Sequence, residues 1–290
     1  MSLSSDWAPI GAPGAGSGVN KADPYGYPHL NSIAKYGDHY LVSSRYMCSV
    51  FFIAPNGSIT WQLHGQTGGD FRLGLGTSFC YQHDVRFESQ SPERVTLSMH
   101  NNDNTEFTGH TALTTGLVLD VELKGSKRVT VRGRTWDAAD PVYAESQGSY
   151  QALGNGHVLQ AHGSIPKLEE CGQNGAIVMR ARFGYDNTMQ SYRGYRFPWI
   201  GRPNTTPNVV TCPVVGKKHT AVYVSWNGAT DVESWKVVSG SRLIQTALRN
   251  GFETTIFVDG LSSHGTVVVE AVGGVGNGTR SQPIPVGQGC

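Results

Sequence analysis

Short runs of alternating apolar and polar residues, separated by turns that contain glycine, are the feature that most constrains the fold of this chain. Residues 49–53 and 58–63 flank Pro55-Asn56-Gly57, and Asn-Gly between two such runs is the strongest short signal for a β-hairpin. Residues 149–153 and 157–161 flank Gly154-Asn155-Gly156 in the same way. The chain is therefore predicted to consist of antiparallel hairpins, as an all-β protein.

The same kind of run recurs along most of the chain, at 39–43, 84–87, 94–99, 116–121, 129–131 and 176–181. The best helical candidate, 232–248, is interrupted by glycine. A meander of roughly 40 to 45 residues has the size of one β-propeller blade. Residues 1–22 are predicted to be irregular, and residues 23–213 have room for roughly four blades.

The C-terminal part differs in its spacing. Strand-like runs at 220–226 and 265–271 recur at the interval that is typical of a β-sandwich. We therefore expect residues 214–290 to form a small sandwich of the immunoglobulin or fibronectin type III kind.

Charge and hydropathy restrict the partners. Lys and Arg number 23, and Asp and Glu number 22, so no net field attracts nucleic acid or an acidic membrane surface. No run approaches the roughly 18 apolar residues of a spanning helix. The first residues have neither the basic end nor the apolar block of a signal peptide. We therefore expect a protein that binds neither nucleic acid nor membrane.

Cysteines and glycosylation sequons bear on the compartment. The five cysteines, at positions 48, 80, 171, 212 and 290, are compatible with two disulfides and one free thiol, whose pairing the sequence does not give. Sequons begin at Asn56, Asn204 and Asn277. Both observations are compatible with a glycoprotein that enters the secretory pathway, and we expect the protein to be secreted.

Three side chains stand at the ends of strand-like runs between residues 27 and 87. His29 and His83 each lie at such an end, and Arg45 closes the run that begins at Tyr40. If neighbouring strands bring these ends together, two imidazoles and a guanidinium line one pocket. Arginine binds pairs of anionic oxygens, and a neutral imidazole can act as a nucleophile. The sequence therefore predicts an oxyanion pocket at these three residues.

Six segments, at 27–33, 41–45, 57–63, 79–87, 148–156 and 223–230, follow one another in the order of a known family. On these segments the chain resembles the arylsulfate sulfotransferase family, and in particular its fungal branch. The resemblance implies a six-bladed β-propeller, of which this chain would hold about four blades. It also implies transfer of a sulfuryl group from an aryl sulfate to a phenol without a nucleotide donor.

The resemblance assigns roles to individual residues. His83 matches the histidine that becomes transiently sulfated, and His29 and Arg45 match the residues that hold the sulfuryl oxygens. Asn31, Asn102 and His162 are expected to complete the substrate pocket. Neither a metal nor a cofactor takes part in this scheme, so the partners would be a small aryl sulfate and a phenol.

The chain departs from the family pattern in three places. No Asp-x-His-Glu segment, which carries the family's first functional histidine, precedes Tyr27, and the N-terminal third is therefore expected to be missing. Open propeller edges would favour self-association. His100-Asn101-Asn102 replaces Phe-Asp-Asn, and His162 stands where tryptophan is usual.

Simpler interpretations stand beside these. His83, His29 and His162 can each be structural histidines, and Arg45 can pair with Asp70 or Asp84. The ten histidines contain no His-Glu-x-x-His motif, so a metal site is the less favoured hypothesis. The alternative function is a catalytically inactive, secreted propeller that acts as a binding or scaffold protein.

Overall fold

The computed structural model describes residues 21, 26, 28–105, 111–186 and 188–287, and these residues form β-strands and connections without any helix. The prediction of an all-β protein is confirmed. Among the same residues, no helix has the length and apolar character needed to cross a membrane. The chain divides into two compact units, Met1–Arg196 and Phe197–Cys290, which are described separately.

The first sheet of the first unit is an antiparallel meander, β1-β2-β3-β4-β5. It consists of β1 (Leu30–Tyr36), β2 (His39–Ser44), β3 (Ser49–Ile53), β4 (Ile59–His64) and β5 (Gly68–Gly69). The predicted Asn-Gly hairpin joins β3 and β4. Gly57 has φ +83°, and the Asn56 Oδ1 accepts the Ser58 N–H at 3.0 Å. This local turn chemistry explains why the hairpin was predictable.

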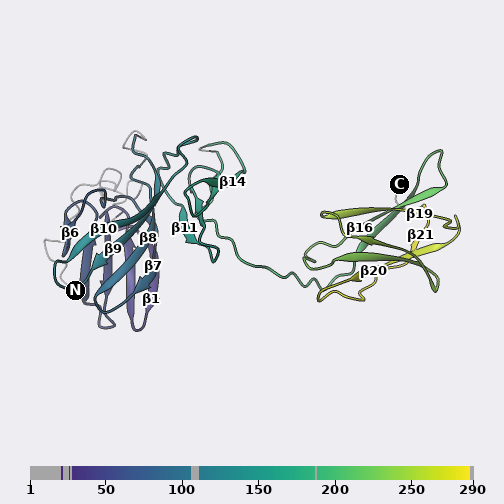
Figure 1. The fold of residues 1–290 in the computed structure, drawn as a ribbon, viewed down its shortest axis with the longest axis horizontal. Helices are drawn as coiled ribbons and strands as arrows, with labels where there is room; N and C mark the ends of the chain where they lie inside the picture. The colour runs from purple at the N-terminus through teal and green to yellow at the C-terminus, as the bar shows by residue number, and fades with distance from the viewer. Residues whose placement is uncertain (1–20, 22–25, 27, 106–110, 187, 288–290) are drawn as a thin grey trace. The chain divides into compact units, whose positions relative to one another are not determined.

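The second sheet has the order β6-β10-β9-β8-β7, and Figure 1 shows its strands labelled in that order. Its members are β6 (Arg72–Leu73), β7 (His83–Gln90), β8 (Arg94–Asn101), β9 (Thr115–Glu122) and β10 (Arg128–Thr135). The strand-like runs at 116–121 and 129–131 pair with each other in β9 and β10, with Val121 opposite Val129.

The third sheet is again an antiparallel meander, β11-β12-β13-β14. Its strands are β11 (Ser149–Ala152), β12 (Val158–Ala161), β13 (Lys167–Cys171) and β14 (Ile177–Arg182). The first turn of this meander is the predicted Gly154-Asn155-Gly156.

The main apolar core of the first unit joins its first two sheets. Leu41, Val50 and Leu63 contribute from the first sheet, and Leu97 and Leu119 from the second. Each buried aliphatic side chain of this kind stabilises a fold by about 1.5–3 kcal/mol. Packing between sheets therefore fixes where their strand ends meet.

The described part of 23–213 forms three sheets in the first unit, whereas the repeat length predicts about four blades. The difference arises after β14, because the described residues between 183 and 207 form no strand. Pro198, Pro203 and Pro207 lie in this stretch, and proline cannot donate to a strand ladder.

The second unit contains two sheets that share one core. The three-stranded sheet, β15-β16-β19, holds β15 (Asn208–Pro213), β16 (His219–Ser225) and β19 (Glu253–Asp259). The four-stranded sheet, β18-β17-β20-β21, holds β18 (Arg242–Leu248), β17 (Ser234–Ser239), β20 (Thr266–Val272) and β21 (Ile284–Pro285). Burial alternates along β19 and β20, and their inward side chains include Ile256 and Val269 of the common core.

One strand of this unit lies before residue 214, where the sandwich is expected to start. β15 lies before that residue, yet it pairs with β16, with Val209 opposite Val224. The buried side chain of Val209 belongs to the core of the second unit. The domain limits 1–22, 23–213 and 214–290 themselves stay a prediction.

One disulfide, Cys48–Cys80, lies in the first unit and spans 32 positions of sequence. Cys212 is also disulfide-bonded, whereas Cys171 is a buried free thiol. The Cys48–Cys80 bond joins the turn after β2 to the segment that leads into β7. It therefore links the first sheet to the second next to two of the predicted site residues.

Candidate functional site

The predicted site residues lie at equivalent ends of the first hairpin in each sheet. Leu30 of β1 pairs with Ser44 of β2, which places His29 and Arg45 just beyond the same end. His83 begins β7 and lies opposite His100, close to Asn102 after β8. The pairing of Ser149 with Ala161 puts Gln147 and His162 at the corresponding end of the third sheet.

His83 is the most constrained of these residues. Its side chain is 2% exposed. The Nδ1 nitrogen lies 2.8 Å from the Asn102 Oδ1 and 3.0 Å from the Tyr81 carbonyl oxygen, while the Nε2 accepts the backbone N–H of Gln147 at 3.2 Å. Two acceptors at Nδ1 and one donor at Nε2 define the tautomer with the proton on Nδ1. The lone pair of the imidazole is therefore on Nε2.

The electrostatic surroundings keep this imidazole neutral. Burial lowers the pKa of His83 to about 3, and the neighbouring Arg45 and His29 act in the same direction, against the hydrogen bond to Asn102. A buried imidazolium would lack solvation and would face the Arg45 guanidinium. His83 can therefore present a free electron pair throughout the neutral and mildly acidic range.

Arg45 and His29 adjoin each other. The Arg45 backbone N–H donates to the His29 carbonyl oxygen at 3.0 Å, and both side chains contact Tyr46. The Tyr46 ring lies edge-on to His29 with centroids 4.8 Å apart, and its hydroxyl accepts an N–H from the Arg45 Nη1 at 3.1 Å. The Arg45 side chain is 4% exposed, so this guanidinium is held inside the protein.

The segment 144–147, which precedes β11, connects Arg45 to His83. The Arg45 Nη2 donates to the Glu145 carbonyl oxygen at 2.8 Å, two residues before the Gln147 N–H that contacts His83. Because two residues of backbone span at most roughly 7 Å, the guanidinium and the imidazole face neighbouring points of one segment. The structure thus brings His29, Arg45 and His83 into one region, although it leaves their roles as predictions.

Asn102 is committed to protein partners. Besides accepting from His83, its amide Nδ2 donates to the Ala144 and Gln147 carbonyl oxygens, at 3.2 and 3.0 Å. Its side chain is fully buried. This geometry suits Asn102 to orienting His83. The substrate contact expected of Asn102 stays a prediction.

Asn31 lies beside the same strand end. Its Nδ2 donates to the Gln82 carbonyl oxygen at 2.6 Å, so it supports the residue that precedes His83. Its backbone oxygen accepts an N–H from the Arg193 Nη2, also at 2.6 Å.

Asp84 and Asp70, which were alternative partners of Arg45, have other contacts. Asp84 pairs with Arg86 at 2.7 Å and with Arg193 at 3.4 Å. Asp70 accepts the Gln62 N–H at 2.7 Å.

Left-handed backbone conformations gather around these side chains. Positive φ angles occur at seven of the described non-glycine residues, and four of them, His29, Tyr81, Asp84 and Gln147, lie here, with values of 50°, 55°, 53° and 64°. Such conformations cost of the order of 1 kcal/mol or more and cluster at functional sites. Their concentration here supports the hypothesis that this region carries the function.

His162 lies in a neighbouring cluster. Its Nε2 contacts the Glu169 Oε2 at 2.8 Å, and its ring lies 5.3 Å from that of His100, centroid to centroid. Both rings are buried. His162 therefore packs against His100 inside the protein and has Glu169 as its polar partner.

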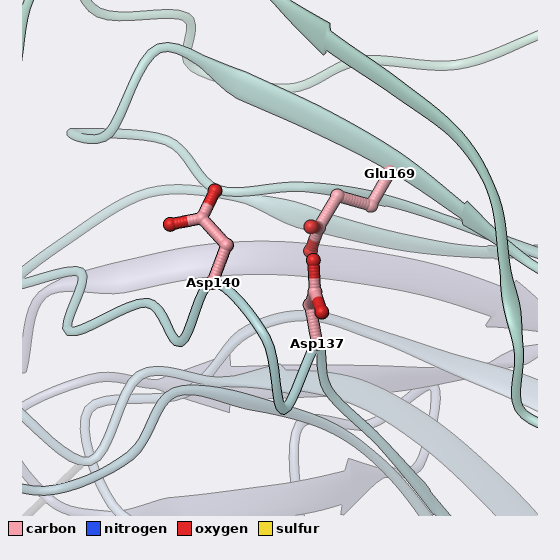
Figure 2. Close-up of side chains that lie close together, drawn as sticks. All are labelled: Asp137, Asp140 and Glu169. Atoms are coloured by element: carbon pink, nitrogen blue, oxygen red, sulfur yellow. The ribbon is translucent and has the colours of Figure 1, made fainter.

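Glu169 belongs to a trio of carboxylates with Asp137 and Asp140, shown in Figure 2. The Lys167 Nζ lies 2.6 Å from the Glu169 Oε1, 2.7 Å from the Asp140 Oδ2 and 3.8 Å from the Asp137 Oδ2. A hydrogen bond from Arg180 holds the pKa of Asp137 well below its usual range. The ammonium of Lys167 thus occupies the position that a metal ion would take among these carboxylates.

Sequence reasoning missed Glu145, Gln147 and the orienting role of Asn102. Gln147 precedes β11 much as His29 precedes β1, so an alignment of the three hairpins by their first strands would have identified it. Glu145 acts through its backbone oxygen, for which side-chain chemistry offers no signal.

These observations define an all-β protein with a buried polar site built from histidine, arginine and backbone groups at the ends of three hairpins. Residues 4–184 match the family described as arylsulfotransferase (ASST). Because this match spans more than half of the chain, the protein belongs to that family. Its membership implies an aryl sulfotransferase-like function and small aryl substrates.

Two other comparisons are less informative. The chain is similar to the crystal structure of a protein of unknown function from Bacteroides caccae, with 11% sequence identity and a TM-score of 0.33. The similarity covers 83% of this chain and 69% of that one. A search of curated proteins finds no match.

Proposed function

We propose that the protein transfers a sulfuryl group from an aryl sulfate to a phenol through a covalent intermediate on His83. The observation that carries the proposal is the state of its imidazole, which is buried and neutral, with Nδ1–H bonded to Asn102 and the lone pair on Nε2. A nucleophile with these properties needs no base to activate it.

The reaction would have two balanced halves. The His83 Nε2 forms a bond to sulfur while the bond between sulfur and the aryl oxygen breaks, and the phenolate leaves with the electron pair. In the second half, the oxygen of an acceptor phenol bonds to sulfur, its proton passes to solvent or a base, and the bond between Nε2 and sulfur breaks. Sulfuryl transfer of this kind resembles phosphoryl transfer, in which positioned charge supplies most of the catalysis.

Arg45 and His29 are the groups proposed to hold the sulfuryl oxygens. Both lie near enough to His83 to lower its pKa. The Arg45 Nη2 already donates a hydrogen bond to an oxygen atom, the backbone carbonyl oxygen of Glu145. A guanidinium suits the negative charge that three sulfuryl oxygens share. Loss of one such donor typically lowers the rate about a hundredfold to a thousandfold.

A second function, that of a catalytically inactive binding or scaffold protein, has one observation in its favour. The side chains of His83 and Arg45 are only 2% and 4% exposed, and backbone groups of residues 145 and 147 occupy their reactive atoms. A site that has lost its substrate would keep such contacts for packing.

The proposal also covers the type of β-fold and the location of the protein. Three meanders joined at one end are compatible with part of a six-bladed propeller of the fungal branch, and two sheets around one core with an immunoglobulin-like sandwich. The Cys48–Cys80 disulfide supports secretion, and exposed asparagines at 56, 204 and 277 support glycosylation. Self-association through open propeller edges is part of the same proposal.

The test is incubation with 4-nitrophenyl sulfate and phenol. We expect release of nitrophenolate that depends on phenol, formation of phenyl sulfate, and loss of both with His83→Ala. Mass spectrometry of the protein quenched without phenol should find one sulfuryl group on the peptide that contains His83. Turnover that persists in His83→Ala would exclude this nucleophile, and a folded wild-type protein without turnover would favour the scaffold.

A further inference from the structure

The segment 144–147 covers His83 and Arg45 with its backbone. Its residues Glu145, Ser146 and Gln147 are half-buried, whereas the two side chains beneath it are buried. One side of the segment thus faces the site, and the other side faces solvent.

The contact at His83 is incompatible with the covalent step. The Gln147 nitrogen lies 3.2 Å from Nε2, with its N–H directed at the lone pair. A bond from Nε2 to sulfur is much shorter than this contact and uses the same lone pair. Sulfur and the Gln147 nitrogen therefore cannot both stand before Nε2, so the segment must move before sulfur can approach.

The segment is held at Ala144 and Gln147 by the Asn102 amide, at Ala144 also by the Thr114 hydroxyl, and at Ser146 by an N–H from Ser164 at 3.1 Å. Two further contacts lie at its end next to β11. The Gln147 Nε2 donates to the Gln190 Oε1 at 2.8 Å, and Gln190 is exposed. The Gly148 N–H donates to the Tyr192 carbonyl oxygen at 3.0 Å. Positive φ angles of 64° at Gln147 and 107° at Gly148 mark the bend where the segment enters β11. Glycine adopts such an angle freely, whereas at Gln147 it costs of the order of 1 kcal/mol or more.

We propose that residues 144–147 form a strap that closes the site, that the Gln147–Gln190 side-chain pair is its latch, and that substrate reaches Nε2 only when the strap opens. The claim that substrate enters when the strap opens rests on the function proposed above. The claim that the strap covers the His83 Nε2 does not, because it concerns only whether a reagent can reach this atom.

Access can be measured without turnover. Diethyl pyrocarbonate modifies neutral imidazole nitrogens, and peptide mass spectrometry gives the rate at each histidine. An exposed hydrogen bond shifts an equilibrium by about twofold to tenfold. Gln190→Ala should therefore raise the labelling rate of His83 by that factor, while His219, a half-exposed histidine of the second unit, keeps its rate.

The matched control is Gln151→Ala. The Gln151 side chain also bonds to the segment that follows Gln190, through the N–H and carbonyl oxygen of Arg196, at 2.8 and 2.9 Å, but no contact of this pair reaches the strap. This variant should leave the labelling of His83 unchanged. Equal labelling in Gln190→Ala and wild type would overturn the latch.

A locked form tests the strap itself. The double variant Gln147→Cys/Gln190→Cys, joined by a short bifunctional thiol reagent, should label His83 at least about tenfold more slowly than either single-cysteine variant treated alike, because only an opened strap frees Nε2. Unchanged labelling in the joined protein would refute the strap. If labelling follows the lock but no variant transfers sulfate, the strap stands and the proposed function fails.

Discussion

The tautomer of His83 can be tested by giving its partner a charge. Asn102→Asp keeps the size of the side chain and puts a carboxylate where an amide oxygen now lies 2.8 Å from Nδ1. An opposite charge within about 4 Å typically raises the pKa of a histidine by about 1 to 3 units. From a starting value of about 3, the imidazole of the variant should titrate between about pH 4 and 6.

The sign of the effect follows from the protonation state that reacts. Only neutral His83 has a free lone pair, so activity falls below its pKa. In the wild type this acid limb should lie near pH 3, and kcat/KM should show no loss from His83 between pH 7 and pH 5. In Asn102→Asp the limb should move up into the range of about pH 4 to 6.

Two measurements check this prediction. NMR titration of the His83 Cε1–H gives the pKa without substrate, and a stopped assay with 4-nitrophenyl sulfate, developed in alkali, gives the pH profile. Asn102→Ala is the control, because it removes the acceptor without adding charge and should lower the rate without raising the limb. A wild-type His83 that titrates near pH 6.5, or a limb that Asn102→Asp does not move, would refute the reasoning.

Three further predictions concern stability. First, the folded-state pKa of His83 lies below the ordinary value of 6.5, so the stability of the neutral form is complete above about pH 6.5 and is lost as pH falls toward 3. Urea unfolding should show that the free energy of unfolding falls by about 2 kcal/mol at pH 5 because of this group. His100→Phe removes a second buried histidine whose pKa is lowered by burial, so the free energy of unfolding of this variant should depend less steeply on pH. An unchanged dependence on pH would contradict this. Second, Gly148→Ala should cost about 2 kcal/mol or more in the same assay, because its Cβ would lie 2.3 Å from the His100 Cδ2 at a φ of 107°; a neutral effect would show that His100 moves freely. Third, Lys167→Met should cost about 3 to 5 kcal/mol by thermal unfolding, since it leaves the buried Asp137 and Glu169 without their closest ammonium; a loss below about 1 kcal/mol would show that Arg180 suffices.

The hairpins were predictable because their information is local. The Asn-Gly turn at Asn56 and the alternation of the flanking runs specify one hairpin whatever the rest of the chain does. The end of β2 and the start of β7 likewise follow from the runs beside Arg45 and His83. Once the sheets pack, residues at equivalent strand ends come together, which is why the sequence could predict that these side chains lie in one region.

What the sequence could not give depends on contacts between distant segments. The partner of Arg45 at Glu145 is 100 positions away and is a backbone oxygen. The partner of Lys167 at Asp140 lies in another connection, and no periodicity marks either. The pairing of β15 with β16 likewise depends on tertiary contacts, and no run in the sequence analysis predicted it.

The Cys48–Cys80 bond lies between two of the predicted site residues in the sequence. Cys48 follows Arg45 by three residues, and Cys80 precedes His83 by three, so one covalent link ties the guanidinium turn to the imidazole turn. A loop of this length contributes about 4 kcal/mol by restricting the unfolded chain. With this bond formed, the unfolded chain already keeps the turns of Arg45 and His83 near each other, so less conformational entropy is lost when these two side chains come together.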